Sequence, residues 1–109
     1  MNEGTLNQDQ QEQLLFMMLI QQHQQIGMMG LGKLQNPATN KIEKDMASAK
    51  YAIDTLNVIE KYTKGNLPQE LKGFLDQVLT TLRLNFADEA AKEDHKSSED
   101  SEQPNKADG

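Results

Sequence analysis

The chain has 109 residues, no cysteine and a formal net charge of −6. This length allows one domain, and the lack of cysteine excludes disulfides, thiolate zinc sites and a cysteine nucleophile. Eight acidic residues and three lysines between Asp88 and Gly109 carry −5 of the net charge, so residues 1–87 are nearly neutral. Neither part has the excess of Lys and Arg that phosphate binding requires, which argues against nucleic acid as a partner.

The first predicted element is a helix over about residues 9–32. Asp9 is a candidate N-cap residue, with Glu12 three residues later as in a capping box. The apolar run Leu14–Ile20 is far shorter than the roughly 20 residues that cross a bilayer. It is also a poor signal peptide, because acidic residues and no Lys or Arg precede it. We therefore expect a soluble cytoplasmic protein.

The apolar run covers every side of this helix, and such a helix is expected to be buried on every side. A helix of a three-helix bundle buries only one stripe, so part of the run is left for a partner, since exposed apolar patches usually mark interfaces. The alternative is a monomer in which loops cover the excess. The predicted interface residues are Leu14, Leu15, Phe16, Met18, Leu19, Gln22, Ile26 and Met29.

The polar segment Gln21–Gln25 follows the run and also covers every side of the helix. It lies either at a solvated end or gap, or in a buried polar layer that fixes the register between helices. His23 has no His or carboxylate three or four residues away, so no helical pair of metal ligands exists. We predict a surface imidazole at His23, and no metal, cofactor or catalytic residue in the chain.

The second predicted helix covers about residues 41–63 and the third about residues 68–91. Apolar residues recur in both at steps of three and four, which places them on one face. Gly65 stands where a left-handed C-cap is expected, and Pro68 suits the first turn of the third helix. Residues 92–109 are acidic and have no apolar anchor, which predicts a disordered tail.

A set of short motifs lies between Leu31 and Phe86, and the string Thr63 to Leu67 is the most distinctive of them. The others are Leu31-Gly32, Asn36-Pro37, Thr39, Lys41 with Glu43, Ala49-Lys50, Ile53-Asp54, Leu56, Lys61 and Leu82-Arg83. In these residues the chain resembles a short bacterial family that is catalogued as a domain of unknown function. The resemblance implies an all-helical protein and supplies no activity, cofactor or functional residue.

These patterns predict an all-α domain over residues 1–91, a three-helix antiparallel bundle or hairpin arrangement that oligomerisation completes. The expected function is that of a non-enzymatic interaction or scaffold protein. It would self-associate through the apolar N-terminal helix, with a homodimer as the preferred form, or it would bind another protein. The alternative is a peripheral membrane or hydrophobic-peptide binder that uses the methionines of that helix. Anionic membranes favour Lys and Arg beside the apolar face, whereas this helix has glutamines and acidic residues there, with Lys33 alone at its end.

Overall fold

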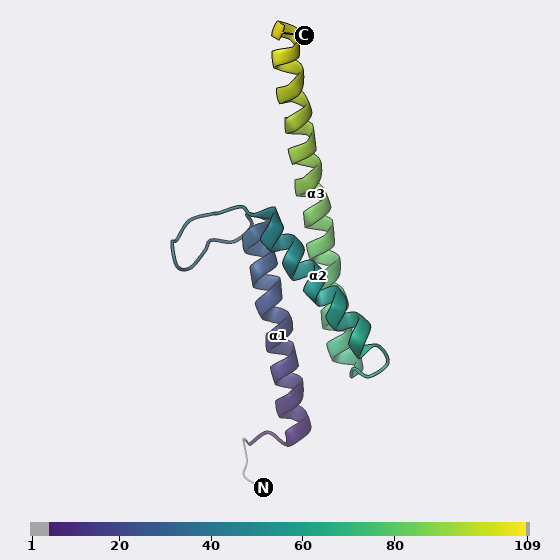
Figure 1. The fold of residues 1–109 in the computed structure, drawn as a ribbon. Coiled ribbons are helices and arrows are strands. Elements are labelled where there is room, and N and C mark those ends of the chain that lie inside the picture. Colours follow the sequence, from purple (N-terminus) through teal and green to yellow (C-terminus); the bar gives the residue numbers. More distant parts are fainter. Residues whose placement is uncertain (1–4, 109) are drawn as a thin grey trace.

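The computed structural model describes residues 5–108, with side chains through Glu93. It consists of the helices α1 (Gln8–Gly30), α2 (Met46–Thr63) and α3 (Gln69–Asp108). Figure 1 shows α1 and α3 running in the same direction, with α2 returning between them, so that helices adjacent in the sequence are antiparallel. The predicted all-α class and three-helix antiparallel arrangement are confirmed.

The N-terminus of α1 is capped two residues earlier than predicted. The Asn7 side chain accepts a hydrogen bond from the Gln10 backbone N–H at 2.8 Å, and the Gln10 side chain accepts one from the Asn7 N–H at 3.0 Å. This reciprocal pair forms a capping box and places Asp9 in the first turn of α1. The helix ends at Gly30, and Gly32 adopts a positive φ of 78° in the turn that follows.

The predicted start of α2 at residue 41 was five residues too early. Asp45 is the N-cap, because its side chain accepts hydrogen bonds from the backbone N–H groups of Ala47 and Ser48. Before it, an isolated bridge between Asn36 and Lys41 closes a loop. The left-handed residue expected after the helix is confirmed at Gly65, which has φ 79°.

The backbone of α3 continues to Asp108, beyond the end predicted near residue 91. Figure 1 shows this extension projecting past the other two helices. The side chains from residue 94 onward lie outside the described residues. The predicted disorder of residues 92–109 falls largely on that part and stays a prediction.

The core is formed by one face of each helix, and the stripes predicted for α2 and α3 supply most of it. Its buried members are Ile20, Leu31, Ala49, Ile53, Leu56, Leu75, Val78, Leu79 and Leu82. Phe16 and Met28 of α1 pack against this cluster from the side, as do Phe74 and Phe86 of α3. One side of α1 is therefore committed to the core.

Two glycines of α1 allow its C-terminal half to cross α2 closely. A Cβ atom at Gly30 would lie 2.7 Å from both the Asp45 carbonyl oxygen and the Ala49 amide nitrogen, which are backbone atoms. A Cβ at Gly27 would lie 2.7 Å from the Leu82 side chain of α3. The Asp45 N–H donates to the Gly30 carbonyl oxygen at 2.8 Å, so a backbone hydrogen bond joins the two helices at this crossing.

A cluster of lysines around Glu89 ties α3 to the loop between α1 and α2. The carboxylate oxygens of Glu89 lie 2.7 Å from Lys44 Nζ, 3.0 Å from Lys33 Nζ and 3.2 Å from Lys92 Nζ. The hydrogen bond from Lys44, with those from Lys33 and Lys92, lowers the pKa of Glu89 from 4.5 to about 2. Lys44 also pairs with Glu93 at 3.1 Å, and both acids raise its pKa. Glu89 is buried, so this cluster fixes where α3 leaves the body of the protein.

Replacing Gly30 with alanine should lower the free energy of unfolding by about 1–3 kcal/mol, because the added Cβ meets backbone that cannot rotate away. The matched control is Gly73→Ala in α3, where nothing lies within 4 Å of the added Cβ. That change should raise stability by about 0.5–1 kcal/mol through helix propensity. Urea denaturation measures both. Equal effects of the two substitutions would show that the α1–α2 crossing is looser than described.

The Glu89 cluster should make stability depend on acidic pH. Because the pKa of Glu89 is lower in the folded than in the unfolded state, its contribution is complete above about pH 4.5 and is lost as the pH falls toward 2. Glu89→Gln should lower the Tm at pH 7 and flatten its dependence on pH across this window. The control Asp54→Asn removes an exposed pair with Lys50 and should change stability by less than about 0.5 kcal/mol. A Glu89→Gln protein with the wild-type Tm at pH 7 would contradict the assignment.

Candidate interaction surface

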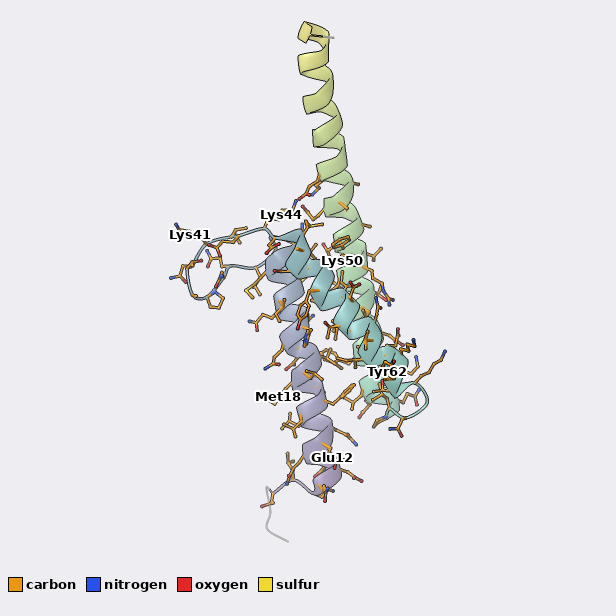
Figure 2. The ribbon with its side chains drawn as sticks, in the orientation of Figure 1. Glu12, Met18, Lys41, Lys44, Lys50 and Tyr62 are labelled. Atoms are coloured by element: carbon orange, nitrogen blue, oxygen red, sulfur yellow. The ribbon has the colours of Figure 1, made fainter. Side chains whose placement is uncertain are left out.

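The side of α1 that faces away from the core carries exposed apolar side chains over its N-terminal half. The exposed fractions are 46% for Leu14, 64% for Leu15, 46% for Met18 and 37% for Leu19. Met18 points away from the other two helices in Figure 2. We call these four residues the apolar face of α1.

The remaining predicted interface residues lie elsewhere on α1. Phe16 packs against the core, because the helical period places it on the opposite side from Met18. Ile26 and Met29 are half-buried beside the loop between α1 and α2, whereas Gln22 is exposed. The structure therefore brings four of the eight predicted residues together as one exposed apolar face and places Gln22 at its end.

The polar segment after the apolar face is solvated in the single chain, apart from two side chains. Gln21, Gln22 and Gln25 are exposed and Gln24 is half-buried. A buried polar layer is therefore possible only between copies of the chain. No residue from Gln13 to Gly32 is charged, so the whole exposed side of α1 between Glu12 and Lys33 is neutral.

His23 is buried, and the prediction of a surface imidazole was wrong. Its ring is 9% exposed, because α2 packs across this side of α1 and places the Tyr51 ring 6.0 Å from it, centre to centre. The His23 Nδ1 lies 3.0 Å from the Leu19 carbonyl oxygen, which satisfies one ring nitrogen within the same helix. Residue spacing along α1 carries no signal of this contact, since Tyr51 belongs to another helix.

A groove of about 280 Å³ adjoins the apolar face where the first turns of α1 and α3 meet. Its apolar lining comes from Leu6, Leu14 and Met17 on one side and Leu71 on the other. Leu14 belongs to both the groove and the apolar face, so the two form one continuous apolar surface. The sequence gives no signal that Leu6 and Leu71 belong to this surface, because only the packing of α1 on α3 brings them together.

A second cleft, of about 620 Å³, lies where α2 turns into α3. Its lining includes four residues of the distinctive string, namely Thr63, Lys64, Gly65 and Leu67. The apolar side chain of Leu75 lines it as well. Two of its charged groups form an ion pair: Lys72 contacts Asp76 at 2.7 Å, which lowers the pKa of the Asp76 carboxyl and raises that of Lys72.

Two further features bear on the class of protein. Within the part of the chain whose side chains are described, no three or more His, Cys, Asp or Glu residues gather as a metal site would require. None of the helices, over the residues described, combines the length and apolar character needed to cross a bilayer.

A family model described as a domain of unknown function, DUF1844, matches residues 13–88. No curated protein matches the chain, and neither does any solved structure. The matched span begins one residue before Leu14 and ends one residue before Glu89, so it contains α2 and most of α1 together with the part of α3 that packs on them. It also extends the resemblance seen from Leu31 to Phe86 back over the apolar face of α1. The chain therefore belongs to this family of domains of unknown function, DUF1844.

Proposed function

We propose that this chain is a non-enzymatic interaction protein of the cytoplasm that self-associates through the apolar face of α1. The observation that carries the proposal is the combination of Leu14, Leu15, Met18 and Leu19, exposed together, with a helix surface that has no charge between Glu12 and Lys33. Solvated helix faces are normally charged or polar, and contiguous exposed apolar side chains usually mark an interface. The lack of cysteine suits a reducing compartment.

The size of the apolar face indicates how strong such an association can be. Burying a Leu or Met side chain completely stabilises by about 1.5–3 kcal/mol, so burying the exposed half of four such side chains in each of two copies gains on the order of 6–12 kcal/mol. Association costs about 4–15 kcal/mol in lost freedom of motion. The apolar face alone thus supports a weak dimer, and a tight one needs the adjoining groove and the glutamines as well.

A neutral face favours a second copy over the alternative partner, an anionic membrane. Peripheral membrane helices place Lys and Arg beside their apolar residues, whereas the polar neighbours of this face along α1 are glutamines and the acidic residue Glu12. The nearest lysine along the chain, Lys33, is paired with Glu89 at 3.0 Å. A face without charge meets no electrostatic repulsion from its own copy.

Light scattering across a range of concentrations tests the proposal. The wild-type chain should approach twice its 12.3 kDa mass at high concentration. Leu15→Glu should keep the protein monomeric, because pairing would bury an uncompensated carboxylate. The matched control is Leu84→Glu on α3, since Leu84 is 67% exposed against 64% for Leu15, and this variant should dimerise like the wild type. A wild-type chain that stays at 12.3 kDa throughout would refute self-association.

A further inference from the structure

We infer that two copies pair through α1 in an antiparallel arrangement whose two-fold axis passes between Phe16 and Met17. The inference rests on the proposed self-association and specifies its geometry. In this register Leu15 of one copy faces the partner's Met18, and Leu14 faces the partner's Leu19. Further along, Gln11 faces the partner's Gln22.

The order of polar and apolar residues along α1 selects this register. Residues 7–13 are polar, residues 14–20 are apolar and residues 21–25 are polar again. An antiparallel pairing matches the exposed apolar residues with each other only when its centre coincides with the centre of the apolar face. That centre lies between Phe16 and Met17, because Leu14 and Leu15 precede it by the same spacing at which Met18 and Leu19 follow it. Gln11 and Gln22 are both exposed. Each glutamine amide has a donor and an acceptor, so two facing glutamines can hydrogen-bond to each other.

The charges at the start of α1 select the antiparallel orientation. A parallel pair would place Asp9 and Glu12 beside the same residues of the second copy, which is repulsive. In the antiparallel pair the two Glu12 residues are offset by nine positions, or about 13 Å along the helix. Glu12 then faces the partner's Gln21, whose amide can donate to it, and the two helix dipoles oppose each other.

The loop between α1 and α2 supports the same orientation. It leaves the C-terminal end of α1 toward the side to which Met18 points (Figures 1 and 2). In a parallel pair both loops would compete for the space between the helices. A pairing centred on Gln22 would bring the partner's first turn against this loop. With the axis between Phe16 and Met17, the first residue of the partner's α1 lies opposite Gln25. The partner's helix therefore does not reach the loop.

The adjoining groove gives one partner side chain a place to bind. Leu14 borders the groove between α1 and α3, and in the inferred register it faces the partner's Leu19. The partner's leucine can therefore fill part of the volume lined by Met17 and Leu71. Because the pair is symmetric, the same contact forms twice. It buries apolar surface in addition to that of the apolar face, which by itself supports only a weak dimer.

Single cysteines test the pairing without interference, because the chain has none of its own. Gln11→Cys and Gln22→Cys both replace exposed side chains, and circular dichroism should show that the helical content of each variant is unchanged. Under mild oxidation of the full chain, a mixture of the two variants should form a disulfide-linked dimer. Neither variant alone should do so, since its two cysteines would be about 16 Å apart along the helix, beyond the roughly 7 Å between Cα atoms that a disulfide spans.

Each other pattern overturns the inference in an identifiable way. Crosslinking of both variants alone would show a parallel pair, and crosslinking of Gln22→Cys alone but not Gln11→Cys would place the axis at Gln22. Leu84→Cys, on α3, sets the background from random collision. A dimer in light scattering without the mixed crosslink would leave self-association standing and this geometry refuted. A monomer in light scattering would refute both.

Discussion

The crossing of α1 on the first turn of α2 is the contact on which the rest of the structure depends. The absence of a side chain at Gly30 lets the α1 backbone approach Ala49 closely enough for the Asp45 N–H to donate to the Gly30 carbonyl oxygen. Both ends of the intervening loop are thereby held together. As a result Lys33 and Lys44 lie on the same side of the protein, where the Glu89 carboxylate of α3 bridges them.

The same crossing explains why α1 has an exposed apolar face. Only the C-terminal half of α1 packs closely on α2, and the two helices diverge toward the N-terminus (Figure 1). The N-terminal half contacts α3 along one side and leaves Leu15 and Met18 uncovered. The radius of gyration is 19.0 Å, against about 13 Å for a compact domain of this length. The projecting α3 accounts for part of this difference, and the shortest dimension of 15 Å shows how flat the arrangement is.

The ion pairs and the uncharged helix surface lie on different parts of the molecule. Ion pairs hold α3 at Glu89, and Lys72 pairs with Asp76 within α3, whereas the exposed side of α1 has no charged residue between Glu12 and Lys33. The ion pairs at Glu89 therefore add to the apolar core in holding α3 beside the loop between α1 and α2. The exposed side of α1 carries apolar side chains and glutamine amides instead, and both kinds of group can pair with an identical surface.

The sequence by itself determined the helical class, the number of helices and the presence of excess apolar surface on the first one, because periodicity and turn residues such as Gly65 act locally. It did not determine which side of α1 is exposed, since a run that is apolar on every side carries no directional signal. The tertiary structure decided this by packing Phe16 inward and leaving Leu15 outside. It also buried His23 against Tyr51 and gathered three lysines around Glu89. Those contacts join residues far apart in the chain, which residue spacing cannot reveal.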